Sequence, residues 1–193
     1  MEKLFLIITL LSTASNTLPT KSRSDLKITT AVEKLAFKKY CQSDPNSKWI
    51  QGRCYYFSKE LHNFDNAKDQ CQFHFMYKNQ NRLGKLYEPK SVIEFLSMYK
   101  IAQEKFTEKS PGFWLGINDI ENEGVFKYVS NNQSLLGEWN ARLPWAPNQP
   151  NGGKKENCLT GMRFRWYDYD CSKIAWSICE STSDRFSKIS PKK

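Results

Sequence analysis

The chain has 193 residues, of which 39% are apolar and 25% charged, a profile typical of a globular protein with one packed domain and some additional sequence. Its net charge is +9, from 29 basic and 20 acidic residues. A basic surplus of this size suits anionic polysaccharides, anionic membranes or nucleic acid, and it equally suits an ordinary solvated surface. No apolar run approaches the roughly 20 residues that cross a bilayer, so no membrane span is expected.

The first residues, MEKLFLIITLLSTAS, have the layout of a secretory signal peptide. Lys3 precedes an apolar run from Leu4 to Leu11, and the small residues Ala14 and Ser15 follow it. The alternatives are a membrane anchor or a buried strand, but about 8 apolar residues are too few to span a bilayer. We therefore expect residues 1–15 to be a signal peptide and the protein to be secreted and extracellular, which argues against nucleic acid as a partner.

Six cysteines bear on both fold and compartment: Cys41, Cys54, Cys71, Cys158, Cys171 and Cys179. In an oxidising compartment this even number implies three disulfides. A closed zinc site lacks its ligand pairs, because no two cysteines stand at C-x-x-C or C-x4-C spacing and the only histidines are His62 and His74. Six cysteines allow 15 pairings, and their spacing alone does not choose among them.

Residues 16–40 are rich in Ser, Thr and Lys with scattered apolar residues. This composition predicts a basic linker or neck that ends in a short helix. The apolar pattern is too short for a coiled coil, which needs three or four sustained heptads. A basic tail, residues 181–193, closes the chain. The folded domain is expected between them, at residues 41–180.

Two helices are predicted inside this domain. The first has apolar residues at i, i+3, i+7 and i+11 on one face: Phe64, Ala67, Cys71 and Phe75. The second has a similar apolar face: Val92, Phe95, Leu96 and Tyr99. The S-x-x-E of Ser91 and Glu94 is a start signal for the second helix, and Pro89 is expected in its first turn.

Beyond Ser110 the pattern changes to short aromatic or β-branched segments, which predict strands: FWLGI, VFKYVS, CLTGM, FRWYDY and IAWSICE. In the last one, Ile174, Trp176 and Ile178 alternate with small residues, as in a strand with one buried face. Helices followed by strands indicate an α+β fold rather than βαβ units. The stretch from Trp139 to Asn157 has no period and three prolines. Long irregular loops are often functional, so the binding site is expected there.

In the order and spacing of its motifs, the region 41–180 resembles the C-type lectin domain. The matching pieces are Cys41, CYYFS at 54–58, F-x-x-A-x-x-x-C at 64–71, WLGI at 114–117, EG-x-F-x-Y at 123–128, QPN at 149–151, Cys158, W-x-D-x-x-C at 166–171 and ICE at 178–180. The resemblance implies a C-type lectin-like fold with two helices, short and mostly antiparallel strands, and a long irregular binding loop. It also implies the disulfides Cys41–Cys54, Cys71–Cys179 and Cys158–Cys171.

The resemblance further implies that the long loop carries calcium and sugar. Calcium takes six to eight oxygen ligands, from carboxylates, amide carbonyls and water. Gln149 and Asn151 flank Pro150, whose peptide is cis in the lectins, and in an extended chain residues two apart leave the same face. Glu156 and Asp168 would supply the negative charge. In sugar-binding members, two neighbouring sugar hydroxyls complete the metal shell and hydrogen-bond to the same side chains.

This chain departs from the family pattern at the expected calcium site. Mannose-type lectins resemble EPN in this loop and galactose-type lectins QPD, whereas the QPN here has no acid. Tyr167 stands where sugar binders carry Asn, and a phenol is a poor replacement for an amide carbonyl as a calcium ligand. Two carboxylates therefore remain where three are usual. Since extracellular calcium sites can already be as weak as ~10⁻⁴ to 10⁻³ M, weakened calcium dependence is expected.

A second calcium site would use Asp119 and Glu123, which match ligand positions of the family. It too lacks ligands, because Gly152 has no side chain and Asn157 stands where an acid is usual. Asp170 is two residues from Asp168 on the same strand face and is an alternative source of negative charge.

Each of these features also has a purely structural interpretation. The QPN segment can be a turn, and Trp145 and Trp166 suit core packing better than sugar stacking. Four basic residues near the site suit sulfated or sialylated glycans, or simply a solvated face: Lys154, Lys155, Arg163 and Arg165. Asn132 begins the sequon NQS and is a glycosylation acceptor if exposed.

The sequence leaves three classes of function to weigh: a glycan-binding protein, a lectin-like domain without calcium, and an enzyme. The favoured one is a secreted protein that recognises glycans or glycoproteins, with anionic polysaccharide among them, through the long loop. The alternative is a lectin-like domain that has lost calcium and binds a protein or an anionic surface. An enzyme is not expected, because the chain has no G-x-S-x-G and no zinc motif. The sequence carries no signal for the number of subunits.

Overall fold

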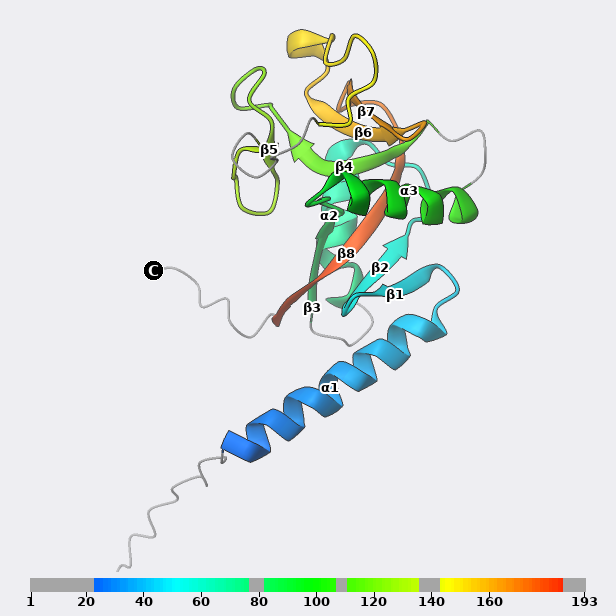
Figure 1. Ribbon diagram of the computed structural model, residues 1–193, viewed down its shortest axis with the longest axis vertical. Helices are drawn as coiled ribbons and strands as arrows, with labels where there is room; N and C mark the ends of the chain where they lie inside the picture. Colours follow the sequence, from blue (N-terminus) through cyan, green and yellow to red (C-terminus); the bar gives the residue numbers. More distant parts are fainter. Residues whose placement is uncertain (1–22, 77–81, 107–110, 136–142, 186–193) are drawn as a thin grey trace, which may run out of the picture. The chain divides into compact units, whose positions relative to one another are not determined.

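Figure 1 shows the computed structural model of the chain, which describes residues 23–76, 82–106, 111–135 and 143–185. The expected signal peptide, residues 1–15, and the last residues of the basic tail, 186–193, lie outside these ranges. Among the helices within them, none is both long enough and apolar enough to cross a membrane.

Much of the expected linker is helical, since helix α1 covers Arg23–Ser43. The chain divides into two units between Lys34 and Leu35, and α1 contributes to both. In the second unit Phe37 is 3% exposed, with its ring 5.8 Å from Trp49 and 5.9 Å from Phe75. The packed unit thus begins before Cys41, because Phe37 already buries its ring in it.

The eight strands form one mixed sheet: β1 Ser47–Ile50, β2 Arg53–Phe57, β3 Arg82–Leu86, β4 Phe113–Asn118, β5 Lys127–Tyr128, β6 Cys158–Met162, β7 Arg165–Tyr169 and β8 Trp176–Arg185. Its order is β1-β2-β8-β4-β6-β7, with β3 on β8 and β5 on β4. The β4–β8 pairing is parallel and the others are antiparallel. Strand β7 therefore lies at the edge of the sheet, where the long loop meets it.

Strand β8 differs from the expected one-sided strand. Ile174 precedes it and is 53% exposed, and β8 is buried on both faces, through Ile178 on one side and Cys179 on the other. The reason is its central place: Ile178 packs in one aromatic cluster with Trp166, and Cys179 in a second one with Trp114. A strand between two cores needs no polar face.

Helices α2 (Phe64–His74) and α3 (Val92–Lys105) lie where the sequence predicts them. Asn63 caps α2 by accepting a hydrogen bond from the Asn66 N–H, and Ser91 caps α3 by accepting one from the Glu94 N–H. The expectation that Pro89 lies in the first turn of α3 is wrong, because Pro89 precedes the cap. The third α-helix of the described chain is α1, which is longer than the short helix expected at the end of the linker.

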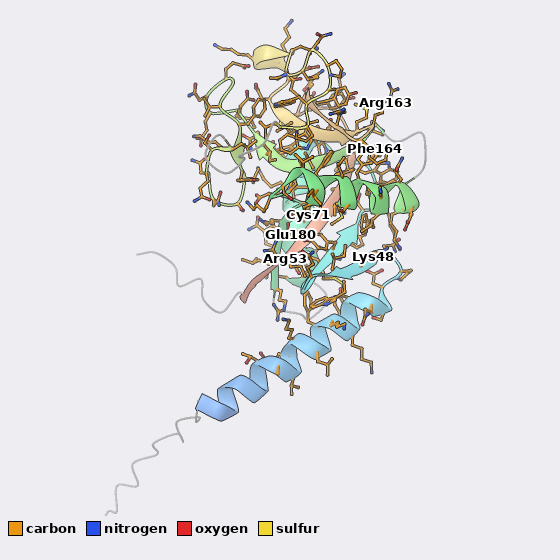
Figure 2. All side chains as sticks on the ribbon, viewed as in Figure 1. Lys48, Arg53, Cys71, Arg163, Phe164 and Glu180 are labelled. Atoms are coloured by element: carbon orange, nitrogen blue, oxygen red, sulfur yellow. A yellow bond between two sulfur atoms is a disulfide. The ribbon has the colours of Figure 1, made fainter. Side chains whose placement is uncertain are left out.

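Three disulfides are present, and their pairs are those that the resemblance implies: Cys41–Cys54, Cys71–Cys179 and Cys158–Cys171. Cys71, labelled in Figure 2, joins α2 to β8 across 108 residues of sequence. Cys158–Cys171 joins the start of β6 to the turn after β7 and so fixes the strands beside the long loop.

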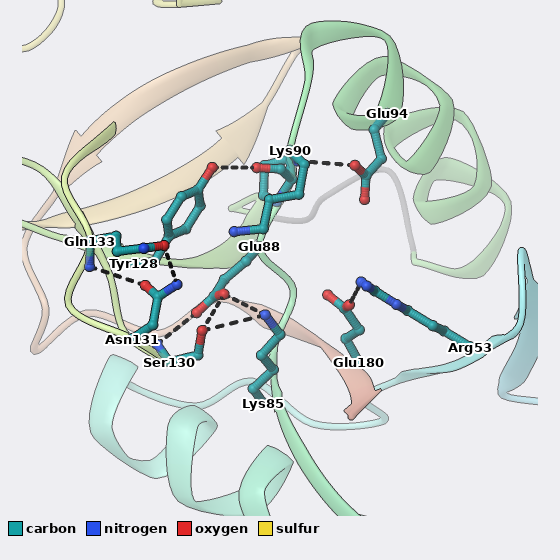
Figure 3. Close-up of polar contacts among 11 residues, drawn as sticks. Arg53, Lys85, Glu88, Lys90, Glu94, Tyr128, Ser130, Asn131, Gln133 and Glu180 are labelled. Carbon is teal, nitrogen blue, oxygen red and sulfur yellow. Dashed lines mark hydrogen bonds and ion pairs between the residues drawn. The ribbon is translucent and has the colours of Figure 1, made fainter. Parts of the chain in front are cut away.

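Two buried carboxylates near β3 and β8 each have a basic partner (Figure 3). Glu88 pairs with Lys85 and accepts hydrogen bonds from the Ser130 N–H at 2.8 Å and the Ser130 hydroxyl at 2.6 Å. Glu180 pairs with Arg53. Burial raises the pKa of Glu180, while Lys85 and Arg53 oppose that rise. Both pairs compensate buried charge, and the Arg53–Glu180 pair also connects β2 to β8.

Candidate functional site

The long loop is fixed to the edge strand by its own backbone. The Trp166 N–H donates to the Pro144 carbonyl at 2.8 Å, and the Ala146 N–H donates to the Trp166 carbonyl at 3.0 Å. The Trp145 ring lies 5.9 Å from that of Trp166 and 5.1 Å from that of Phe126. Trp166 is fully buried, so both tryptophans serve packing, and Trp166 is not a surface on which sugar can stack.

The QPN segment makes the turn that brings the loop to Asp168. The Gln149–Pro150 peptide is cis. The Gln149 N–H donates to the Ala146 carbonyl at 3.1 Å, and the Gln149 side-chain carbonyl accepts the Asp168 N–H at 3.2 Å. The Gln149 amide is thereby aimed at β7, toward the residue that supplies the negative charge.

Asp168 is the centre of the site. It is 2% exposed, and its Oδ2 accepts the N–H groups of Asn151 at 2.9 Å and Gly152 at 2.7 Å. Its other oxygen, Oδ1, is buried and has no hydrogen-bond partner among the described residues. A buried carboxylate oxygen without a donor is costly, and a cation would satisfy it.

Glu156 brings a second carboxylate to the same place. It follows the short 3₁₀ helix η3 (Gly153–Lys155) and lies against Gly152, where an added Cβ would be 2.3 Å from Glu156 Oε2. Burial raises the pKa of Glu156, and the charges of Asp168 and Asp170 raise it further. The Glu156 side chain thus occupies the space that a side chain at Gly152 would fill.

Asn151 and Tyr167 contribute less than a full calcium site requires. Asn151 is exposed and reaches Asp168 through its backbone N–H. Tyr167 is half-buried on β7 opposite Thr160, at the position where the resemblance implies an amide carbonyl ligand. Asp170 accepts hydrogen bonds from the Ser172 N–H and hydroxyl, both at 2.8 Å, so its carboxylate is used in a local turn.

The residues proposed for a second calcium site lie close to the first. Asp119 is 3% exposed, its Oδ2 accepts the Gly124 N–H at 2.7 Å, and its buried Oδ1 has no hydrogen-bond partner in the described part of the chain. Burial raises the pKa of Asp119, and the charges of Glu123 and Asp168 add to the rise. Glu123 is exposed, and Asn157 donates its side-chain amide to the Lys154 carbonyl at 3.2 Å.

The donor set fits calcium in part. Asp119 and Asp168 each hold a buried carboxylate oxygen without a donor, and Glu156 adds negative charge beside them. Over the described ranges, however, no three acidic, histidine or cysteine side chains are arranged to hold a metal ion. The described residues therefore gather negative charge here without forming a metal-binding cluster.

Sequence reasoning missed the backbone donors of this site. The N–H groups of Gly152 and Gly124 hold Asp168 and Asp119 in place. Gly124 has φ 78°, a conformation that glycine adopts readily, so a turn glycine after an acid was the one available signal. Asn132 is exposed and directly follows the turn at residues 129–131.

Comparison with known proteins gives a consistent picture. Residues 60–181 match the sequence model of the lectin C-type domain. Human C-type lectin domain family 3 member A is 32% identical over 139 residues, a match that covers 69% of this chain and 61% of that protein, so the chain spans about three fifths of that relative's length.

Two solved structures share the fold. The C-type lectin CEL-I from Cucumaria echinata superposes with a TM-score of 0.60 at 19% identity, over 73% of this chain and 98% of that one. The carbohydrate-recognition domain of cow CD23, solved in the presence of a GlcNAc2Man3 oligosaccharide, gives a TM-score of 0.55 at 25% identity, over 73% and 96% of the two chains.

Proposed function

Because the chain belongs to the C-type lectin domain family, we propose that it is a secreted protein that binds carbohydrate through its long loop, with weakened calcium dependence. Its binding residues are Gln149, Asn151, Glu156 and Asp168. The proposed partners are glycans or glycoproteins outside the cell. The oligosaccharide present in the cow CD23 structure supports carbohydrate as the ligand class.

The observation that carries this proposal is the buried Oδ1 of Asp168. Two backbone N–H groups hold one oxygen of this carboxylate, and the other oxygen has no donor among the residues that the structure describes. A structural aspartate would normally have both oxygens satisfied. Asp168 retains the capacity to accept from a ligand, either a cation or a sugar hydroxyl.

The chain's own residues would divide the work as follows. Calcium, when bound, would attract two neighbouring sugar hydroxyls. Glu156 and Asp168 would neutralise it and accept hydrogen bonds from those hydroxyls, and the Gln149 carbonyl, already oriented by the Asp168 N–H, would complete the acceptor set.

Calcium binding is weak in this proposal because charge and carbonyl ligands are both missing. One unit charge at ~4 Å is worth roughly 4 kcal/mol at an effective dielectric of ~20 before desolvation is subtracted. Even a third of this, for the acid absent from the QPN tripeptide, is about a tenfold loss of affinity.

A second candidate is a calcium-independent, lectin-like domain that binds a protein or an anionic surface. The exposed position of Asn151 and the phenol of Tyr167 favour it. Under this alternative the buried oxygens of Asp119 and Asp168 would be a remnant of the calcium site, and the recognition surface would not need them.

Retention on immobilised mannose and galactose, with and without a chelator, tests the proposal. We expect wild-type protein to be retained in calcium and eluted by chelator, and Asp168→Asn to pass through. Asp170→Asn is the matched control, because it removes an equal charge only two residues from Asp168. The Asp170 carboxylate already accepts a hydrogen bond from the Ser172 N–H. Retention that survives both chelator and Asp168→Asn, or no retention at all, would favour the second candidate.

A further inference from the structure

The hairpin between β6 and β7 ends in an unusual two-residue turn. Met162 and Arg165 form the closing pair, so Arg163 and Phe164 alone make the connection. Both are left-handed, with φ 49° and φ 60°. A two-residue turn of this type normally uses Asn-Gly, because a side chain makes the left-handed conformation unfavourable.

The bulky turn residues are supported from α3. The Arg163 N–H donates to the Tyr99 hydroxyl at 2.5 Å, and the Phe164 ring packs against the Tyr99 ring with centroids 4.3 Å apart and an interplanar angle of 42°. Tyr99 in turn contacts the core rings of Phe95 and Phe113. The fold thus holds an aromatic ring at the tip although a glycine would relieve the backbone.

The tip also presents positive charge around that ring. Phe164, labelled with Arg163 in Figure 2, is 37% exposed. Arg163 and Arg165, on either side of it in the sequence, are exposed as well. Neither guanidinium is in an ion pair with any residue of the described ranges. Lys100, next to Tyr99 on α3, is exposed as well.

We propose that this tip, Arg163 to Arg165 with Tyr99 beneath it, is a second binding site, for a sulfated polysaccharide. A guanidinium on each side of the ring can pair bidentately with sulfate groups, and the exposed edge of Phe164 can pack on a sugar ring. Tyr99 holds the turn backbone and the Phe164 ring in place before the ligand arrives, which lowers the entropy lost on binding.

The apolar surface is too small for a membrane anchor. Peripheral membrane proteins bury a sizeable apolar area in the headgroup region, whereas here a single ring offers about a third of its surface and arginines flank it. A charged, flexible polysaccharide needs only this small aromatic contact, since most of its affinity is electrostatic.

The tip site does not depend on the long-loop site. Arg165 is three residues from Asp168 along β7, roughly 10 Å at 3.3 Å per residue. Its side chain therefore lies outside any calcium shell at Asp168, and sulfated polysaccharide should bind in the presence of chelator.

The test compares binding of the whole protein to immobilised dextran sulfate and to uncharged dextran, in chelator. We expect binding to dextran sulfate only, at least tenfold weaker in Arg163→Gln/Arg165→Gln. The control Lys154→Gln/Lys155→Gln removes the same charge from the exposed η3 and should change affinity no more than twofold. Equal losses in the two variants would mean that net charge alone is sensed and would overturn the site.

A turn substitution separates recognition from folding. Arg163→Asn/Phe164→Gly should raise Tm by roughly 2–6 °C, because it relieves the turn, and still weaken dextran sulfate binding at least threefold. Unchanged binding in this variant would contradict the proposal, as would tighter binding to phosphatidylserine vesicles than to dextran sulfate. Glu156→Gln should bind dextran sulfate normally, because Glu156 is not part of the tip. A variant that loses retention on mannose or galactose can therefore still bind sulfated polysaccharide at the tip.

Discussion

At the scale of residues, the main feature of the site is a set of buried carboxylates whose oxygens are only partly hydrogen-bonded. Asp168 and Asp119 each use one oxygen to accept a glycine N–H and leave the other without a donor among the described residues. Glu156 adds a third negative charge, and the pKa values of Glu156 and Asp119 are raised by burial and by their acidic neighbours. This concentration of charge is what a cation would relieve.

Replacing Tyr167 with Asn should restore a carbonyl ligand. We expect Tyr167→Asn to strengthen calcium binding about tenfold, corresponding to roughly 1.4 kcal/mol. Calorimetric titration with calcium measures this directly. Tyr167→Phe, which removes only the hydroxyl, is the control and should titrate like wild type. An unchanged titration in Tyr167→Asn would count against this description of the site.

The raised pKa of Glu156 gives a pH dependence of stability. A carboxyl whose pKa is higher in the folded than in the unfolded chain keeps its proton longer when folded, so the free energy of unfolding falls as pH rises between the two values. In chelator, Glu156→Gln should therefore gain stability over wild type as pH rises from about pH 4 to neutrality. Thermal unfolding at a series of pH values measures the difference, and a constant difference would show that Glu156 is not repelled by its neighbours.

Residue types and spacing predicted much of the site but not its backbone chemistry. The structure brings Gln149, Glu156 and Asp168 together, as the motifs suggest. It uses the backbone N–H of Asn151, which no pattern of side chains reveals. The sequence likewise could not show that Glu156 folds onto Gly152, because that contact depends on the path of η3.

At the scale of elements, disulfides decide how firmly the long loop is held. Cys158–Cys171 and Cys41–Cys54 both join residues 13 apart, so loop closure predicts a similar stabilisation, about 3 kcal/mol each. Only the first lies beside Glu156 and Asp168.

Removing each pair separates stability from binding. Cys158→Ala/Cys171→Ala and Cys41→Ala/Cys54→Ala should each lower the free energy of unfolding by about 3 kcal/mol. Only the first should also weaken retention on mannose or galactose columns, since it frees β6 and β7 to move apart. Denaturant unfolding and column retention of both variants test this. Equal retention of the two variants would mean that β6 and β7 do not need the Cys158–Cys171 disulfide to keep the site in place.

Elements with strong periodicity were predictable and those defined by tertiary contacts were not. Helices α2 and α3 have both an apolar stripe and a capping residue, and the sequence predicts them well. Strands β1 to β3 lie between polar residues and turns, and they form because β8 pairs with β2 and β3. The exposure of Ile174 and the two-sided burial of β8 likewise follow from packing against two cores, which a single strand cannot reveal.

At the scale of the whole molecule, secretion remains a prediction of the first fifteen residues. Expressed with its own leader in a eukaryotic secretory host, the protein should leave the cell without residues 1–14 or 1–15. It should also carry a glycan at Asn132, which is exposed. Mass spectrometry of the medium, with Asn132→Gln as the control, tests both. Retention in the cell with Met1 intact would contradict the assignment.

The two proposed binding surfaces differ in charge. The long loop offers acidic and carbonyl oxygens at Asp168, and the hairpin tip offers arginines and a ring on the same pair of strands. Neutral sugar and sulfated polysaccharide would then bind through opposite chemistry, one depending on calcium and the other on salt concentration.

A glycan array probed with wild-type protein and with Asp168→Asn, each in calcium and in chelator, tests the central claim most directly. We predict that neutral glycans bind wild type in calcium, that chelator weakens this binding, and that Asp168→Asn abolishes it. Identical binding of the same neutral glycans by Asp168→Asn in chelator would show that the oxygens of the long loop do not bind carbohydrate.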